Sequence, residues 1–124
     1  MQILVIDDDN DLREIISVVL AAEGHEVRAA VDGVAALAEL RRGGRPSLIL
    51  LDMMMPRLDG EGFMRALRTD PSLADVPVVI LTAHPGARQE ATAMGAAGCL
   101  LKPVELAELL ATVEHARHAP GAHP

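Results

Sequence analysis

Five polar residues follow directly on short apolar segments of the sequence: Asp7, Asp8, Asp52, Thr82 and Lys102. Clustered carboxylates repel one another unless one is protonated or a cation binds between them. Ligand sets made only of oxygen favour a hard cation such as Mg²⁺ over zinc, which prefers His and Cys. An ammonium and a hydroxyl beside such a cation are suited to holding a phosphoryl group. If the fold brings these residues together, they could bind a divalent cation and a phosphoryl group.

Five apolar segments predict the strands that would position these residues. Continuous apolar runs occupy Ile3–Ile6, Leu48–Leu51 and Val78–Leu81, and two weaker segments occupy Glu26–Ala30 and Cys99–Leu101. Short continuous runs of this kind are typical of strands buried on both faces of a parallel sheet.

Helical spacing of apolar residues follows each predicted strand. The segments with this spacing are Leu12–Leu20, Val34–Leu40, Phe63–Leu67, residues 87–94 and Leu106–Val113. Asp32 is expected to cap the second of these helices, and Gly24 to stop the first. Strand and helix therefore alternate five times, which predicts a doubly wound parallel sheet with helices on both faces. Sites in such sheets form at the carboxyl ends of the strands.

Each polar residue at these strand ends also has an ordinary structural explanation. Asp9 or Asn10 is expected to cap the first helix, but one cap does not explain Asp7 and Asp8 as well. Lys102 is the single lysine among eleven basic residues, and lysine and arginine are not interchangeable where a compact ammonium must enter a small site. Four strands delivering a carboxylate, hydroxyl or ammonium to one edge favour a functional site.

Length and composition limit the alternatives. A chain of 124 residues has the size of one domain, and its net charge of −7 and single aromatic residue, Phe63, argue against nucleic-acid binding. No apolar run reaches the roughly 18 residues of a membrane span, and the first residues contain no basic leader. With one cysteine and no internal disulfide, we expect a cytoplasmic protein. We expect the domain to occupy residues 1–118, and residues 119–124 to be a flexible tail or the start of a linker.

The sequence resembles the receiver domain of two-component response regulators. The stretches that carry the resemblance are residues 3–9, residues 50–56, Asp59-Gly60, Leu81-Thr82-Ala83 and Leu101-Lys102-Pro103. No single stretch is specific, but their order and spacing cover residues 2 to about 117. The resemblance implies a five-stranded (βα)₅ sandwich with the flavodoxin-like strand order 2-1-3-4-5.

The resemblance also implies a role for each site residue. Asp52 would accept a phosphoryl group from a sensor histidine kinase or a histidine phosphotransfer protein. Mg²⁺, with Mn²⁺ as an alternative, would be bound by Asp7, Asp8, Asp52 and the backbone carbonyl of Met54. Lys102 and Thr82 would contact the phosphoryl group, Ala83 would leave room for it, and the bond before Pro103 would be cis. Phosphorylation would switch the binding of a downstream effector domain or protein, and hydrolysis would end the signal.

Expectations also concern four further residues, Cys99, His84, Leu12 and Ile15. The family usually has Tyr or Phe where this chain has Cys99; we expect Cys99 to be a small buried apolar residue and phosphorylation to survive, while the usual readout through the aromatic ring cannot operate. His84 either tunes hydrolysis or is an exposed loop residue. Leu12 and Ile15 either form a kinase-docking patch with Pro103 or face the core.

Three alternative functions remain beside the phosphorylated switch. A hydrolase of the haloacid-dehalogenase type would need an aspartate where the chain has Met54. A nucleotide- or flavin-binding module would need a glycine-rich first turn, which is acidic here. A degenerate receiver that acts only as a protein-interaction module would normally lack the acidic residues and the lysine. We therefore expect a signalling switch that promotes only its own phosphorylation and dephosphorylation, and no metabolic enzyme.

Overall fold

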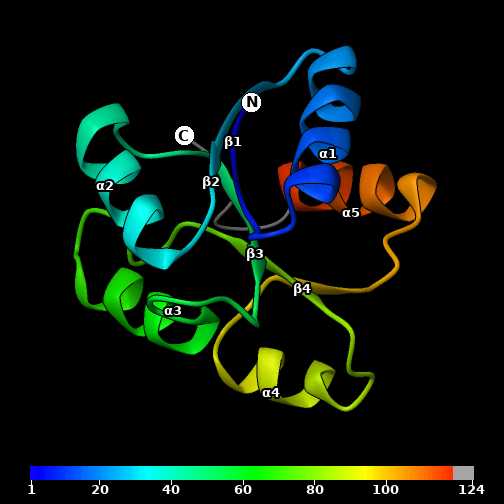
Figure 1. Ribbon diagram of the computed structural model, residues 1–124. Helices are drawn as coiled ribbons and strands as arrows, with labels where there is room; N and C mark the ends of the chain where they lie inside the picture. The colour runs from blue at the N-terminus through cyan, green and yellow to red at the C-terminus, as the bar shows by residue number, and fades with distance from the viewer. Residues whose placement is uncertain (119–124) are drawn as a thin grey trace.

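A computed structural model describes residues 1–118, which form a five-stranded parallel sheet covered by helices on both faces (Figure 1). The elements in chain order are β1 (Gln2–Ile6), α1 (Asn10–Ala22), β2 (Glu26–Ala30), α2 (Gly33–Gly43), β3 (Leu48–Asp52), α3 (Gly60–Thr69), β4 (Val78–Thr82), α4 (Ala87–Ala93), β5 (Gly98–Leu101) and α5 (Leu106–His118). The strand order is β2-β1-β3-β4-β5. The predicted fold class and strand order are confirmed. The predicted tail, residues 119–124, lies outside the described residues.

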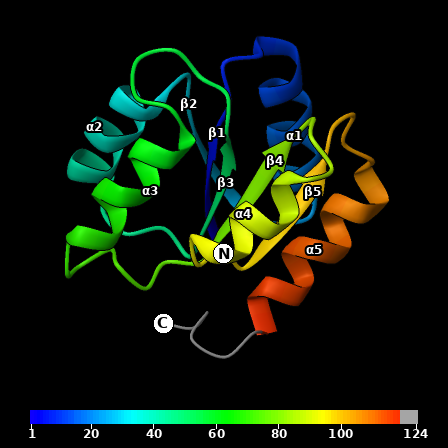
Figure 2. The same cartoon turned by 90° about the horizontal axis from the view of Figure 1, so that it is seen from below.

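Side chains of each central strand alternate between two core clusters. In β1, Leu4 and Ile6 pack with α2, α3 and α4, whereas Ile3 and Val5 pack with α1 and α5. Figure 2 shows the same division, with α2 and α3 on one side of the sheet and α1 and α5 on the other. Because successive side chains of a strand point to opposite faces, a strand covered on both faces must be apolar throughout. This requirement explains the continuous apolar runs of β1, β3 and β4.

Two aspartates fix the starts of helices that flank the site. Asp9, rather than Asn10, caps α1: its side chain accepts hydrogen bonds from the backbone N–H groups of Asp11 and Leu12 at 3.0 and 3.1 Å. Asp32 caps α2 as predicted, accepting from the backbone N–H of Ala35 at 2.8 Å. Caps of this kind satisfy backbone donors that the first helical turn leaves without partners.

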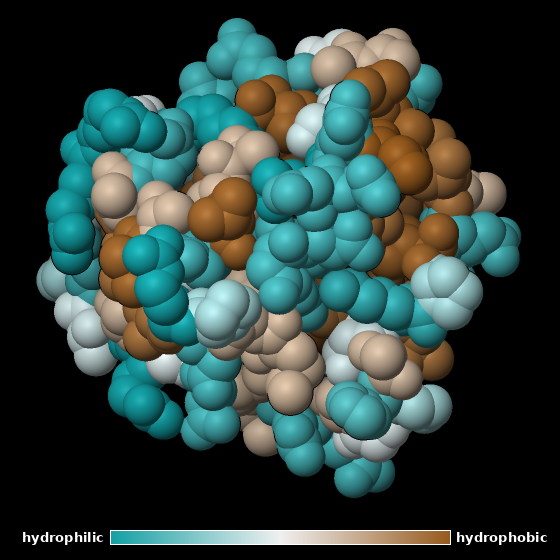
Figure 3. All heavy atoms as spheres, in the orientation of Figure 1, coloured by the Kyte–Doolittle hydropathy of each residue, from teal (hydrophilic) through white to brown (hydrophobic). Residues whose placement is uncertain are grey.

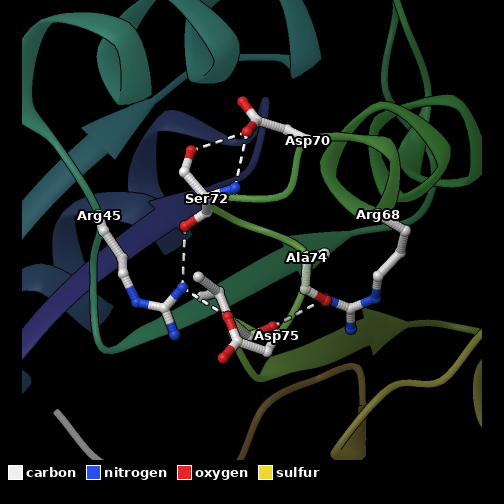
Figure 4. A network of polar contacts seen from close by, with 7 residues as sticks. Arg45, Arg68, Asp70, Ser72, Ala74 and Asp75 are labelled. Carbon is white, nitrogen blue, oxygen red and sulfur yellow. Dashed lines mark hydrogen bonds and ion pairs between the residues drawn. The ribbon is translucent and has the colours of Figure 1, made fainter.

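A polar network fixes the loop that leads into β4, at the amino end of that strand and therefore at the opposite end from the carboxyl edge (Figure 4). Arg45 donates through Nη1 to the backbone carbonyl of Ser72 at 2.9 Å and to Asp75 Oδ1 at 2.6 Å. Arg68 donates to the backbone carbonyl of Ala74 at 2.9 Å. These bonds give the loop's carbonyl groups partners that regular secondary structure does not supply.

Candidate functional site

The strand register gathers the predicted site residues at one edge of the sheet. Ile6 pairs with Leu51, so Asp7, which follows β1, lies beside Asp52, the last residue of β3. Thr82 ends β4 and pairs with Leu101, the residue before Lys102. Each of these side chains therefore comes from the carboxyl end of a different strand, where open parallel sheets place their ligands.

Three carboxylates from two strands form a cluster at this edge. Asp7, Asp8 and Asp52 each offer a carboxylate oxygen, and these oxygens lie within 4.8 Å of one another. Asp7 is fully buried and Asp52 is 3% exposed, whereas Asp8 is exposed. Like charges at this separation repel one another, so the cluster is poised to bind a cation.

Lys102 supplies the positive charge that faces the cluster. Its Nζ lies 3.1 Å from Asp7 Oδ2 and 3.3 Å from Asp52 Oδ1. Its backbone N–H donates to the carbonyl of Thr82 at 2.7 Å, which continues the pairing of β4 with β5. The Lys102–Pro103 peptide bond is cis, as the resemblance implies. One ammonium therefore contacts two of the three carboxylates.

The electrostatic state of the site follows from burial and from these contacts. Burial, reinforced by the charge of Asp7, raises the pKa of Asp52 to about 6; the Met54 N–H and Lys102 oppose this shift without cancelling it. Burial acts to lower the pKa of Lys102, but its contacts with Asp7 and Asp52 outweigh burial, and that pKa is raised. At neutral pH Asp52 is therefore mainly a carboxylate and Lys102 an ammonium.

The remaining predicted residues lie around this cluster. The backbone N–H of Met54 donates to Asp52 Oδ1 at 3.2 Å, and its side chain is 69% exposed. Thr82 is buried, and its hydroxyl oxygen accepts a hydrogen bond from the backbone N–H of His84 at 3.1 Å. Ala83 and His84 are both exposed. The Thr82 hydroxyl therefore accepts one hydrogen bond, which leaves its proton available for donation.

Cys99 lies on the edge strand β5, and Pro103 lies two residues after its end. Cys99 is only partly buried, and it packs against the core cluster on the side of α3 and α4. Burial raises the pKa of its thiol, which disfavours the reactive thiolate. Cys99 was expected to be a small buried apolar residue. It does pack against the core, but it is only partly buried because β5 is an edge strand. Pro103 is exposed at the surface.

Sequence reasoning missed two arginines near the site. Arg13 donates to the backbone carbonyl of Asp7 at 2.7 Å and to Asn10 Oδ1 at 2.5 Å. Arg57 forms an ion pair with Asp32, the cap of α2. The contacts of Arg13 with Asp7 and of Arg57 with Asp32 do not follow from helical or strand spacing, because each joins a long side chain to a residue that precedes a helix. The contact of Arg13 with Asn10 has ordinary helical spacing.

The residues present fit a hard divalent cation. The donor set consists of carboxylate oxygens, which Mg²⁺ and Mn²⁺ prefer. Asp7 Oδ2 is buried and has no hydrogen bond of regular geometry, but the Lys102 ammonium lies 3.1 Å from it. A buried carboxylate oxygen without a hydrogen bond is costly unless a cation lies nearby. The cluster therefore has the ligand chemistry for such an ion, while Lys102 already balances part of its negative charge.

Comparison with known families agrees with this geometry. The model of the response regulator receiver domain family matches residues 3–114, which is most of the chain. The chain belongs to this family. It is therefore the receiver domain of a two-component signalling protein. The family match decides against the haloacid-dehalogenase type of hydrolase and against the nucleotide- or flavin-binding module. The boundary at residue 118 stays a prediction, since the match ends before it.

Two groups of relatives support the assignment of this receiver domain. It is 39% identical over 114 residues to the DNA-binding dual master transcriptional regulator RpaA of Synechocystis. The aligned residues make up 90% of this chain and 47% of RpaA. It is 42% identical over 113 residues to the response regulator MprA of Mycobacterium, covering 90% of this chain and 48% of the relative. The receiver domain thus spans about half the length of the curated relatives it matches.

Solved structures show the same fold. The receiver domain of NtrX from Brucella abortus is similar with a TM-score of 0.86 and 31% identity, covering 95% of this chain and 99% of that one. The chemotaxis protein CheY4 of Vibrio cholerae is similar with a TM-score of 0.84 and 34% identity, covering 92% of this chain and 96% of that one. Among residues 1–118, none of the helices combines the length and hydropathy needed to cross a membrane.

Proposed function

We propose that this receiver domain accepts a phosphoryl group on Asp52 from the phosphohistidine of a sensor histidine kinase or of a histidine phosphotransfer protein. The reaction depends on Mg²⁺, or on Mn²⁺ in its place, and hydrolysis later removes the group. The observation that carries this proposal is the contact of Lys102 with both Asp7 and Asp52 beside the three-carboxylate cluster.

The chain's own residues account for the transfer step. An oxygen of Asp52 forms a bond to phosphorus while the bond from phosphorus to the histidine nitrogen breaks, and that nitrogen takes up a proton. Phosphoryl transfer requires in-line placement and neutralisation of charge more than acid–base work. The Lys102 ammonium neutralises part of the negative charge on the phosphoryl group. The Thr82 hydroxyl can donate its proton to a phosphoryl oxygen. A divalent cation held by Asp7, Asp8, Asp52 and the Met54 carbonyl would neutralise further charge on the phosphoryl oxygens.

The apolar surface over α1 and the start of α5 is the proposed docking face for the phosphoryl donor. Apolar side chains gather there in the space-filling view (Figure 3), and the large exposed ones are Ile15, Val18 and Leu106. Ile15 is 49% exposed, whereas Leu12 packs partly against the core, so Ile15 and Pro103 fit the docking hypothesis better than Leu12 does. Exposed apolar patches of this kind mark protein-interaction surfaces.

The output and location are also proposals. The relatives are about twice as long, and RpaA is described as DNA-binding, so we propose that an attached effector domain or a separate effector protein reads the phosphorylated state. The receiver domain itself, with a net charge of −7, is proposed to bind neither nucleic acid nor membrane. Its single cysteine fits a reducing cytoplasm. Its proposed activity is limited to its own phosphorylation and dephosphorylation.

Intact-mass measurement tests the proposed function. The protein is incubated with phosphoramidate or acetyl phosphate, with Mg²⁺ or with EDTA, beside an Asp52→Asn variant. We expect one added phosphoryl group that requires Mg²⁺ and is absent from the variant. Failure to take up a phosphoryl group from either donor would instead favour a receiver that acts only as a protein-interaction module.

A further inference from the structure

The loop between β3 and α3 contains two residues in an unfavourable backbone conformation. Arg57 has φ of 48° and Leu58 has φ of 72°, although neither is glycine. Residues with a Cβ atom rarely adopt this left-handed region and remain there only where the surroundings impose it. Something in the structure must therefore hold these two residues in place.

The first constraint is an ion pair between this loop and the start of α2. Arg57 donates to Asp32 Oδ2 through Nε at 2.9 Å and through Nη2 at 2.6 Å. The Asp32 side chain is 4% exposed, while that of Arg57 is 66% exposed. The other oxygen of Asp32, Oδ1, accepts the hydrogen bond from the Ala35 N–H that caps α2, so the carboxylate is also fixed independently of Arg57. The bond from Ala35 and, after it, the Arg57 guanidinium lower the pKa of Asp32, so the pair stays charged at neutral pH.

The second constraint is close packing between Leu58 and two glycines. A Cβ atom at Gly33, the first residue of α2, would lie 2.5 Å from the Leu58 carbonyl oxygen. A Cβ atom at Gly62 would lie 2.7 Å from Leu58 Cδ1. The loop therefore rests directly on the start of α2 and on the first turn of α3.

The other end of the same loop contacts the carboxylate cluster. The Met54 N–H donates to Asp52 Oδ1 at 3.2 Å, and the Met53 N–H donates to the carbonyl of Leu81 at 3.2 Å. The Gly60 N–H closes the loop by donating to the Met53 carbonyl at 3.1 Å. The segment from Met53 to Gly60 is thus short, closed on itself and bound at both ends.

We propose that Arg57 and Asp32 are positioning residues for the divalent-cation site, because their ion pair holds the loop that places the Met54 backbone beside Asp52. Neither residue contacts the cation in this account; both act through the loop. The inference rests on the proposed function, since it requires that the carboxylate cluster binds Mg²⁺.

The positioning effect can be separated from a simple effect of charge. Arg57→Gln removes a positive charge, so charge alone would strengthen cation binding. Asp32→Asn removes a negative charge, so charge alone would weaken it, while asparagine retains the cap of α2. If the pair positions the loop, both substitutions weaken binding in the same direction. Outer contacts of metal ligands are worth 10- to 100-fold in affinity; this pair is one step further away, so we expect about threefold to tenfold.

The experiment is a calorimetric titration of each protein with Mg²⁺ alone, with urea unfolding as the check that each variant is folded. We expect Arg57→Gln and Asp32→Asn each to weaken Mg²⁺ binding by about threefold to tenfold. The double variant should bind Mg²⁺ no more weakly than the single variant with the lower affinity, because both substitutions remove the same ion pair. Arg57→Lys should restore part of the affinity. The matched control is Arg65→Gln, which breaks an exposed ion pair with Glu61 on α3 and should leave the affinity unchanged.

The possible failures are distinguishable. If the unsubstituted protein binds no Mg²⁺, both the proposed function and this inference fail. If it binds Mg²⁺ and Arg57→Gln binds equally well or more tightly, the positioning role alone is refuted. Additive losses in the double variant would also refute it, because they would show that the two residues act independently.

Discussion

Replacing Asp52 by asparagine should stabilise the receiver domain when no metal is present. Burial and the charge of Asp7 raise the pKa of Asp52 from 3.8 to about 6, so its ionised form is disfavoured in the folded protein. The difference between a pKa of 3.8 and a pKa of about 6 makes ionisation of Asp52 in the folded protein cost about 3 kcal/mol at most. Solvent at the edge of the sheet screens part of this cost. We predict that Asp52→Asn raises the free energy of unfolding by about 1–2 kcal/mol at neutral pH in EDTA.

The pH dependence of this gain follows from the direction of the shift. Because the folded-state pKa of Asp52 lies above the unfolded value, the folded protein binds the proton more tightly. The stabilisation from protonating Asp52 is complete below the unfolded pKa, and it is lost as the pH rises through about 6. The variant should therefore match the unsubstituted protein in stability near pH 3.5 and exceed it above pH 6.

Urea unfolding followed by far-ultraviolet circular dichroism measures this difference, since the chain has no tryptophan or tyrosine to report by fluorescence. The exposed residue Glu14 offers a matched control, because Glu14→Gln makes the same change in net charge without burial. Excess Mg²⁺ should stabilise the unsubstituted protein and reduce the advantage of Asp52→Asn. Equal or lower stability of Asp52→Asn at neutral pH in EDTA would refute the reasoning, as would an equal gain from Glu14→Gln.

Three further predictions concern the surroundings of the site and the far end of the sheet. Gly60→Ala would place a Cβ atom 2.7 Å from Met53 Cα. We therefore expect this substitution to lower the free energy of unfolding in urea by about 1–3 kcal/mol, and an unchanged unfolding midpoint would contradict this packing. Arg68→Met removes charged hydrogen bonds to the carbonyls of the α3–β4 loop, including Ala74, and should cost about 2–3 kcal/mol by the same assay, whereas a neutral effect would mean that water replaces the guanidinium. His84→Ala should change the rate at which the phosphorylated protein decays, followed by intact mass; equal rates would make His84 an exposed loop residue.

The sheet and its helices could be predicted from the sequence because burial on both faces leaves a strong pattern. The segment Leu48–Leu51 has to be apolar throughout, since its side chains enter both core clusters. The weaker segment Glu26–Ala30 was also predicted with its observed bounds, although it lies at the edge of the sheet. Local patterns gave the strands and the residues at their ends. The strand order that brings Asp7 beside Asp52 came from the resemblance.

Contacts made through irregular turns could not be predicted. The ion pair of Arg57 with Asp32 joins residues that are 25 positions apart in the sequence. Arg57 and Leu58 adopt left-handed backbone conformations without being glycine, so the sequence carries no signal of this turn. Cys99 was expected to be buried, and it is only partly buried because β5 is an edge strand. The roles of the site residues in phosphorylation stay predictions, even though the structure brings Asp8, Asp52 and Lys102 together as expected.

The central claim is that the carboxyl edge of the sheet gathers carboxylate oxygens around a divalent ion beside Asp52. Anomalous diffraction from crystals grown or soaked with Mn²⁺ tests it most directly, because the ion's position is read without reference to any assumed site. We predict one strong anomalous peak within coordination distance of Asp8 and Asp52, with Asp7 bound directly or through water. A peak elsewhere with none at this cluster, or the same peak retained in Asp52→Asn crystals at full strength, would contradict the account.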